Sequence, residues 1–183
     1  ITPVVAEPSV IRVPDNYRTI QGAIDAANPR DIIYVSKGIY GEHLTISKNH
    51  LRLIGEDTDT TIIDGNQTGT VVSVSAKNVT ITGFTVRRSG ESGGGFCLDN
   101  SNDNVIANNT CDDCDVGISL ERSSDNKIIG NTISNSANSI ILSIEKDFET
   151  SFSLIYLPLL SDRFYSHLSS TLLVIRRNHS ERT

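Results

Sequence analysis

The chain has 183 residues and a formal net charge of −6, and it is long enough for one domain with a sizeable core. Basic residues cluster no further than the pairs Arg87-Arg88 and Arg176-Arg177, so nucleic acid is excluded as the expected partner. Met and Trp are absent and aromatic residues make up only 5%, a composition that favours short strands and polar turns over a helical bundle.

The N-terminal segment predicts a strand, a helix and a second strand. SVIRV at 9–13 and DIIYVS at 31–36 have strand-like composition. Between them, Ile20, Ala23, Ile24 and Ala27 form one apolar helical stripe, which predicts a helix over about 18–27 that ends before Pro29. We expect this helix to cover the open end of a stack of strands.

The stretch GIYGEH at 38–43 has the residue mix of an acid/base site. In an extended strand Tyr40 and Glu42 share a face with Leu44 and Ile46, and that face points to the core or under the helix. A carboxylate there would accept N–H bonds from the turn into the helix. We therefore predict structural roles for Tyr40 and Glu42 and an outward, unpaired His43.

The chain is similar to itself at an offset of 22 residues, because 100–123 aligns with 122–145. The aligned pairs are Asp103 with Asp125, Asn104 with Asn126, Ile106 with Ile128, Asn109 with Asn131, Cys111 with Ile133, Ile118 with Ile140 and Leu120 with Leu142. KNVTITGFTV at 77–86 aligns with the same half-repeat, placing Asn78 on Asn104, Val79 on Val105 and Gly83 on Asn109. NHLRLIG at 49–55 lies 28 residues before KNVTITG.

A period of this length indicates a stacked repeat fold. A leucine-rich repeat is the alternative, but the inward positions are mostly Ile and Val, and short alternating runs fill the whole unit. The sequence therefore predicts an all-β, right-handed parallel β-helix with an N-terminal capping helix. Asn109 and Asn131 would occupy one turn in successive coils and hydrogen-bond from coil to coil.

TIQGAIDAANPRDIIYVSKGIYGEHLTI at 19–46 resembles the opening of many right-handed β-helix proteins, including pectin methylesterases and the NosD-type surface and periplasmic proteins. LRLIGEDTDTTIIDGN at 51–66 resembles their second coil, and SSDNKIIGNTIS at 123–134 is similar to the NosD-type repeats. The resemblance covers roughly 11–142 and implies the fold. No stretch resembles the QDTL or DFIFG motifs of the esterases, so it does not imply esterase activity.

Acidic residues recur at equivalent positions of the repeat. They are Asp99, Asp103, Asp112, Asp113, Asp115, Glu121 and Asp125. Three interpretations remain open. Asp can serve turn geometry alone, it can bind Ca²⁺ or a glycan, or two acids can form the acid/base pair of a polysaccharide lyase or hydrolase. We name these acids as ligand or cation candidates and name no catalytic residue.

The three cysteines carry weak signals. Cys111-x-x-Cys114 lacks a second pair or a nearby His for zinc, and Cys111 aligns with a core Ile, so we expect it to be a buried apolar residue. A Cys97–Cys114 bridge across adjacent coils is a further hypothesis. The NosD resemblance implies copper handling, but Met is absent and His43, His50, His167 and His179 are scattered. No metal site is therefore predicted.

The repeat stops after about residue 142, which suggests a β-helix domain at 1–146 and an atypical segment at 147–183. FSLIYL at 152–157 is a candidate strand, and apolar residues from Phe164 to Ile175 favour an amphipathic helix. This tail is either a C-terminal cap and homodimer surface or a segment foreign to the repeat. No apolar run is long enough to span a bilayer.

The sequence thus favours a non-catalytic module that is extracellular, on the cell surface or periplasmic, binds carbohydrate or is structural, and has no cofactor unless Ca²⁺ binds the stacked acids. The alternatives are a polysaccharide lyase or hydrolase and a NosD-like copper-handling protein.

Overall fold

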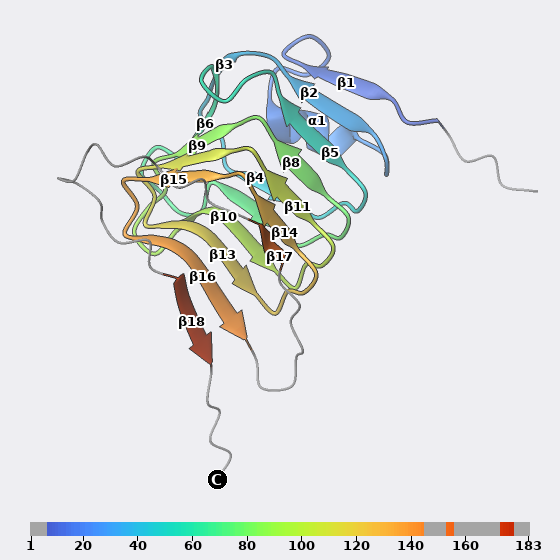
Figure 1. The fold of residues 1–183 in the computed structure, drawn as a ribbon. Coiled ribbons are helices and arrows are strands. Elements are labelled where there is room, and N and C mark those ends of the chain that lie inside the picture. The colour runs from blue at the N-terminus through green and yellow to red at the C-terminus, as the bar shows by residue number, and fades with distance from the viewer. Residues whose placement is uncertain (1–6, 145–152, 156–172, 178–183) are drawn as a thin grey trace, which may run out of the picture.

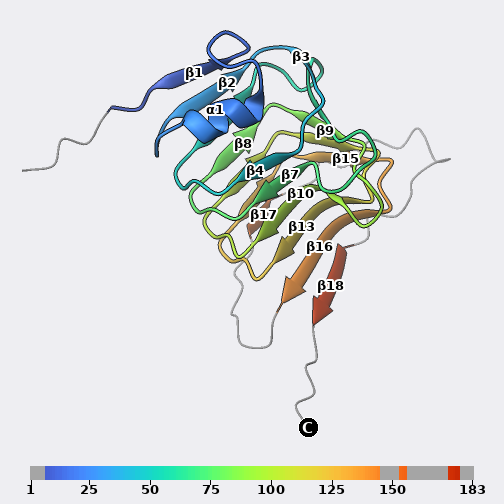
Figure 2. The ribbon, with the colours of Figure 1, turned by 180° about the vertical axis from the view of Figure 1, so that it is seen from behind.

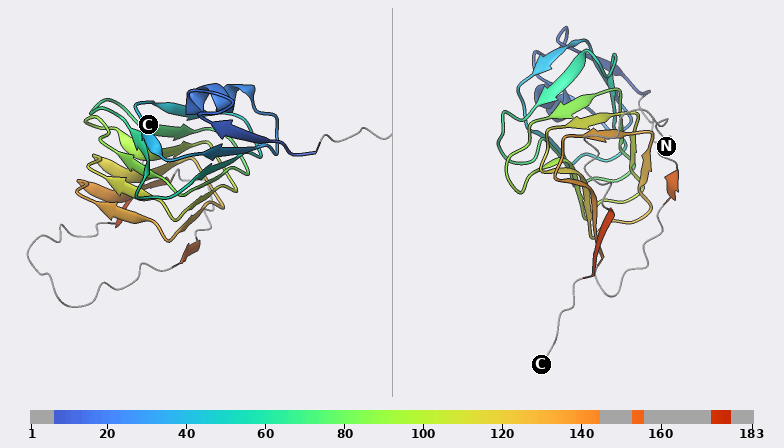
Figure 3. Two further views of the ribbon diagram at one scale, coloured as in Figure 1. Left: turned by 90° about the horizontal axis from the view of Figure 1, so that it is seen from above. Right: turned by 60° about the vertical axis from the view of Figure 1, so that its left-hand side comes forward.

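The computed structural model describes residues 7–144, 153–155 and 173–177, and in this part of the chain it is a parallel β-solenoid with one short helix (Figure 1). Its strands form three sheets that run the length of the stack, and every strand pair between coils is parallel. From β2 to β16, each coil gives one strand to each sheet in turn (Figure 3). The predicted right-handed parallel β-helix is confirmed.

The sheets are built from short strands. The seven-stranded sheet has the order β1 (Val10–Val13), β2 (Ile32–Val35), β5 (Arg52–Gly55), β8 (Thr80–Thr82), β11 (Val105–Ala107), β14 (Lys127–Ile129) and β17 (Ser153–Ile155). The six-stranded sheet has the order β18 (Leu173–Arg177), β16 (Asn138–Ile144), β13 (Val116–Glu121), β10 (Gly94–Asp99), β7 (Val72–Val74) and β4 (Leu44–Ile46). The five-stranded sheet has the order β15 (Thr132–Ser134), β12 (Thr110–Asp112), β9 (Thr85–Arg87), β6 (Thr61–Asp64) and β3 (Gly38–Tyr40).

Strand registers confirm most of the repeat alignment. Cys111 pairs with Ile133 and Leu120 with Leu142, as the offset of 22 predicts. Arg52 pairs with Thr80, which is the predicted offset of 28. The alignment of 77–86 is wrong by one residue, because Thr80 rather than Val79 pairs with Val105.

This one-residue error has a clear physical reason. Side chains in a strand alternate between the two faces, so a shift by one residue exchanges core and surface positions. Asn104 occupies the position of Val79 in the preceding coil, and Asn109 occupies that of Phe84. These two asparagines and the two apolar residues that they replace are all buried. The sequence alignment placed Asn78 on Asn104 because the residue types are the same. It therefore did not show that a buried Asn takes the place of a buried apolar residue.

Apolar side chains fill the interior of the coils. The largest fully buried ones are Phe84, Phe96, Ile20, Ile24, Ile33, Leu44, Ile46, Leu51, Leu53, Ile63, Ile81 and Leu98. Most come from strands with alternating burial, because every second residue of a strand faces inward. The stack therefore buries one continuous core that no single coil could form alone.

Buried asparagines link successive coils at two corners. Asn109 accepts a hydrogen bond from the Phe84 N–H (3.1 Å) and donates to the Ile81 carbonyl (3.0 Å). Asn131 accepts from the Asn109 N–H (2.9 Å), and the Asn109 amide also donates to Asn131 Oδ1 (3.2 Å). Asn104 and Asn126 form a second such pair. We call these two pairs the Asn ladders.

The helix α1 (Ile20–Ala26) lies across the N-terminal end of the stack (Figure 2). Thr19 is its N-cap, because the Thr19 hydroxyl accepts a hydrogen bond from the Gly22 N–H. Ile20, Ala23 and Ile24 are buried, as the apolar stripe predicts. Lys48 donates to the Ala27 carbonyl at the other end (3.0 Å), so a cation lies where the helix dipole is negative.

Two strands of the structure fall in the segment after residue 146. β17 pairs with β14 and β18 pairs with β16, both in parallel, so part of the predicted atypical segment continues two sheets of the stack. The helix predicted from Phe164 to Ile175 is wrong for 173–175, which belong to β18, and its remaining part lies outside the described residues. The domain boundary and the homodimer surface stay predictions. Within the described residues, no helix is long and apolar enough to cross a membrane.

Candidate functional site

The stacked acids lie at two different corners of the coils. Asp99 and Glu121 are register partners at the ends of β10 and β13. The turns that follow contain Asp103 and Asp125, which are exposed and have positive φ values of 60° and 56°. Asp99 forms an ion pair with Arg122, and both side chains are almost half exposed. This corner therefore presents acids whose backbone geometry and partners fit a role in the turn.

The other three acids are Asp112, which ends β12, and Asp113 and Asp115, which lie in the turn to β13. Asp112 accepts hydrogen bonds from Ser134 Oγ (2.7 Å) and Asn135 Nδ2 (2.8 Å) of the next coil. Asp115 accepts from the Ser92 N–H (2.9 Å) of the preceding coil. Asp113 is exposed with a φ of 53°. Among the residues that the structure describes, no group of three or more His, Cys, Asp or Glu side chains is placed to hold a metal ion.

Glu42 lies beneath the start of α1. Its two carboxylate oxygens accept from the backbone N–H groups of Ile20 (2.9 Å) and Gln21 (3.0 Å). These N–H groups have no partner inside the helix, so the carboxylate satisfies them and complements the positive end of the helix dipole. The Tyr40 hydroxyl donates to the Ser36 carbonyl (2.8 Å) and its ring packs against the core. Burial and the charges of Glu42 and Glu56 raise the pKa of Tyr40.

His43 is exposed, as the alternation of side chains along the strand predicts, but the expectation that it is unpaired is wrong. Its Nδ1 lies 2.8 Å from the Thr70 carbonyl and its Nε2 lies 3.0 Å from Thr68 Oγ. Both partners belong to the loop between β6 and β7 of the next coil. That loop folds back toward His43, and a sequence pattern does not report such a contact.

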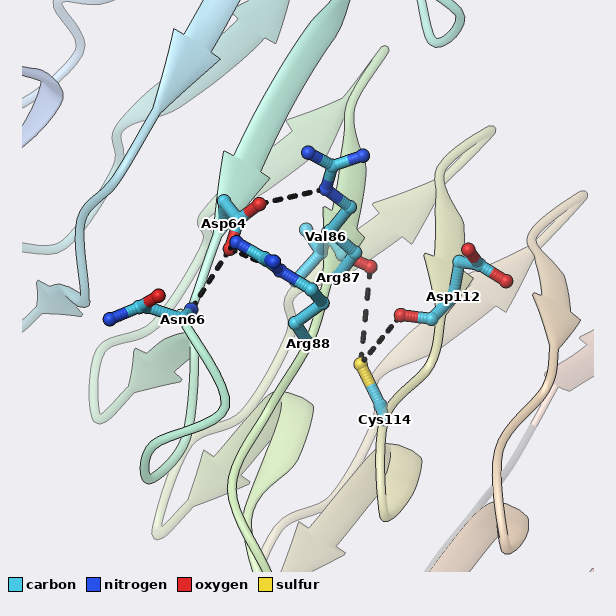
Figure 4. A network of polar contacts seen from close by, with 7 residues as sticks. All are labelled: Asp64, Asn66, Val86, Arg87, Arg88, Asp112 and Cys114. Atoms are coloured by element: carbon cyan, nitrogen blue, oxygen red, sulfur yellow. Dashed lines mark hydrogen bonds and ion pairs between the residues drawn. The ribbon is translucent and has the colours of Figure 1, made fainter.

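Sequence reasoning missed a buried carboxylate beside this loop. Asp64, at the end of β6, is only 4% exposed and accepts from Arg87 Nε (2.8 Å) and Arg88 Nε (2.9 Å), as Figure 4 shows. It also accepts from the Asn66 N–H (2.9 Å). Burial opposes ionisation of Asp64, but the hydrogen bonds from Arg88, Asn66 and Arg87 outweigh it and lower its pKa.

The only sequence signal for this cluster was the adjacent pair Arg87-Arg88. Asp64 and Arg87 are register partners on outward positions of β6 and β9, 23 residues apart. The Arg87 and Arg88 side chains are 32% and 40% exposed, so each arginine remains in contact with solvent while Asp64 fixes its orientation.

A polar hollow lies next to this cluster. It has a volume of about 620 Å³ and is lined by Gln67, Thr68, Gly69, Ser89, Gly90, Glu91 and Asp113. These residues come from the loops after β6, β9 and β12, that is, from three successive coils. The hollow offers hydroxyl, amide and carboxylate groups rather than an apolar lining.

Glycines let two of these loops pack backbone to backbone. The Gly90 N–H donates to the Gly69 carbonyl (2.9 Å), and a β-carbon at Gly93 would lie 2.1 Å from the same oxygen. The Ser89 hydroxyl is buried and donates to the Gly93 carbonyl (3.0 Å). The wall of the hollow is therefore held by contacts that a larger side chain would break.

The cysteine predictions have different outcomes. Cys111 is fully buried in the core, which confirms its assignment as a small apolar residue. The structure contains no Cys97–Cys114 bridge, and the positions of the two side chains rule this pairing out. Cys97 is an outward position between the inward residues Phe96 and Leu98, so the wall of the sheet separates it from Cys114.

Comparisons with known proteins agree with this architecture. The chain is 38% identical over 78 residues to a probable pectinesterase/pectinesterase inhibitor 17 of Arabidopsis thaliana, covering 42% of the chain and 14% of that relative. It is 43% identical over 75 residues to a probable pectinesterase/pectinesterase inhibitor 42 of the same plant, covering 38% of the chain and 13% of that relative. The chain thus spans only about one-seventh of the length of these curated relatives.

A solved structure of carrot pectin methylesterase superposes with a TM-score of 0.50 at 12% identity, covering 83% of this chain and 62% of that one. This likeness concerns the fold alone. A family model described as "Periplasmic copper-binding protein (NosD)" matches residues 15–155, which is most of the chain. Together with the β-helix, this match shows that the chain belongs to the NosD family.

Proposed function

We propose that this protein is a non-catalytic, exported β-helix module that binds polysaccharide in the hollow formed by the loops after β6, β9 and β12. The observation that carries the proposal is the lining of the hollow. The Thr68 hydroxyl, the Gln67 amide and the carboxylates of Glu91 and Asp113 are groups that hydrogen-bond sugar hydroxyls.

The charge of the lining indicates the kind of sugar. Its two charged residues, Glu91 and Asp113, are both acidic and exposed. They would repel free uronate carboxylates and accept hydrogen bonds from uncharged hydroxyls. The preferred ligand is therefore a neutral or methyl-esterified glycan. The names of the curated relatives, which are pectinesterases, support a pectin-related polymer, and the NosD description supports a periplasmic or extracellular location.

The partners of the stacked acids support a non-catalytic role. The carboxylates of Asp99, Asp112 and Asp115 are engaged by Arg122, Ser134 and the Ser92 N–H, respectively. A lyase or hydrolase would require two acids free to exchange protons on either side of a sugar bond. These acids instead stabilise contacts between coils.

The test is isothermal titration calorimetry of the protein with methyl-esterified and de-esterified homogalacturonan. We expect the esterified polymer to bind more tightly. Glu91→Gln combined with Asp113→Asn should weaken its binding about tenfold, which corresponds to about 1.4 kcal/mol. Asn tolerates the left-handed backbone at position 113, so this variant should fold.

Asp103→Asn combined with Asp125→Asn is the matched control, because these acids lie at the other corner of the coils, and it should bind like the wild type. Release of methanol, reducing ends or unsaturated sugars is measured in parallel. Turnover that this control pair abolishes would contradict the binding-module proposal in favour of an enzyme.

Copper handling is a second candidate, favoured by the family match. The described residues do not fit a conventional copper centre, because they contain no group of three or more suitable ligands, and the chain has no Met. Equilibrium dialysis against Cu⁺ distinguishes the two. Retention of stoichiometric copper would support copper handling, and its loss to the buffer would dismiss it.

A further inference from the structure

Two buried thiols lie on the inner side of the corner where β12 turns into β13. Cys111 is 0% exposed and Cys114 is 3% exposed. The chain turns between them at Asp113, whose φ is 53°. This turn directs the side chains of residues 111 and 114 toward the same part of the core.

The two sulfurs converge on Gly95 of the preceding coil. A β-carbon at Gly95 would lie 3.2 Å from Cys111 Sγ and 3.3 Å from Cys114 Sγ. Both sulfurs therefore lie close against the position that a side chain at residue 95 would occupy, and the Gly117 carbonyl oxygen is 2.8 Å from the same position. The arrangement depends on glycine at position 95, because a β-carbon there would clash with this backbone oxygen and press on both sulfurs.

The repeat shows that this pair is particular to one coil. Cys111 pairs with Val86 in the coil before and Ile133 in the coil after, so its position is otherwise aliphatic. Cys114 lies at the position of buried Ser89 and of Ser136, whose hydroxyl accepts from the Cys114 N–H. The neighbouring coils thus place an aliphatic residue and a serine where this coil places two thiols.

We propose that Cys111 and Cys114 are a redox pair that closes to an intramolecular disulfide when the chain folds in the presence of a disulfide-bearing oxidant. The thiolate of Cys114 attacks one sulfur of the oxidant's disulfide and forms a mixed disulfide with it, and the other oxidant sulfur leaves as a thiolate and takes up a proton. Cys111 then loses its proton and attacks the Cys114 sulfur of the mixed disulfide, and the second oxidant thiol leaves. The protein loses two hydrogen atoms and the oxidant becomes two thiols.

The surroundings favour a disulfide over a bound soft metal ion. A copper(I) ion held by two thiolates carries one net negative charge, and burying a charge in an apolar core is costly. A disulfide is neutral. It would also lose only weak hydrogen bonds, since Cys114 Sγ lies 3.5 Å from the Asp112 carbonyl and 3.9 Å from the Val86 carbonyl (Figure 4).

Burial also determines at which stage of folding the two thiols can be oxidised. It raises the pKa of both thiols, well above the ordinary value for Cys111, so little thiolate exists in the folded core. Oxidation should therefore be fast during refolding and slow once the coils have stacked.

The experiment refolds the full chain with oxidised glutathione, denatures it without reductant and counts thiols with a chromogenic disulfide reagent. We expect one thiol per chain, from Cys97, against three after reduction. Peptide mass mapping should find the 111–114 bridge. Adding the oxidant to already folded protein should give three thiols on the same timescale.

The repeat supplies variants that should fold. Cys114→Ser and Cys111→Val introduce residues that neighbouring coils use, and each should leave two thiols that no longer oxidise together. Cys97→Ser copies its register neighbours Ser73 and Ser119 and should leave none after oxidative refolding. Three thiols in the oxidatively refolded wild type, a bridge that includes Cys97, or copper-protected thiols in native mass spectrometry would each overturn the proposal.

Discussion

At the scale of single residues, left-handed backbone at the coil corners explains much of the Asn and Asp content of the chain. Asn and Asp tolerate positive φ better than other side chains, because they hydrogen-bond locally to the backbone. Asn78, Asp103, Asp113, Asp125 and Asn135 are examples. The same chemistry accounts for several acids that looked like ligand candidates in the sequence. Asp64 differs, because its carboxylate is buried and held by cations.

Asp64→Asn should lower the free energy of unfolding by about 1–3 kcal/mol at pH 7, because it removes the charge that orients Arg87 and Arg88. The folded-state pKa of Asp64 lies below its ordinary value of 3.8. Its contribution is therefore present above pH 3.8 and is lost as the pH falls through the lower folded-state pKa.

Urea denaturation of the wild type and Asp64→Asn at pH 7 and in acid checks this, and the gap between them should close in acid. Asp59→Asn, at an exposed turn, should match the wild type at both pH values. An equal gap at both pH values would mean that the charge of Asp64 is not what stabilises the cluster.

At the scale of elements, close approach between neighbouring strands controls how the coils stack. Gly55 ends β5 and Gly83 follows β8 with a φ of 83°. A β-carbon at Gly55 would lie 2.2 Å from the Gly83 carbonyl oxygen. Because that atom is backbone, it cannot move aside without changing the strand register.

Gly55→Ala should therefore destabilise the protein by about 2–4 kcal/mol. Gly41→Ala is the matched control, since no atom lies within 4 Å of its β-carbon position. It should be neutral or stabilise by up to about 1 kcal/mol. Thermal unfolding followed by circular dichroism measures both, and equal midpoints for the two variants would show that the backbones at 55 and 83 are not in close contact.

At the scale of the whole molecule, the Asn ladders join successive coils through buried amides, and the buried Ser123 hydroxyl makes a similar contact by accepting from the Ser101 N–H. Each buried amide satisfies backbone groups of the preceding coil that the corner leaves without strand partners. The continuous apolar core supplies the stabilisation, and the ladders fix which residues meet between coils.

Asn109→Ala removes the acceptor of the Phe84 N–H and the donor to the Ile81 carbonyl, and should cost about 2–3 kcal/mol. Native-state hydrogen exchange checks the mechanism. The Phe84 amide should exchange faster, whereas amides of α1 should not change. The exposed substitution Thr132→Ala should leave Phe84 protected, and uniform loss of protection across the chain would instead indicate global destabilisation.

The sequence by itself determined the β-helix, the covering helix and the coil offsets of 22 and 28 residues, because these depend on local alternation, helical spacing and turn residues that recur along the chain. Parity also placed Tyr40 and Glu42 inward and His43 outward. Only the tertiary structure decided the one-residue register at Val105, the pairing of Asp64 with Arg87 and Arg88, the hollow, and the convergence of two thiols on Gly95. These features join residues of different coils, and the loops between coils vary in length, so no fixed period in the sequence predicts which side chains meet.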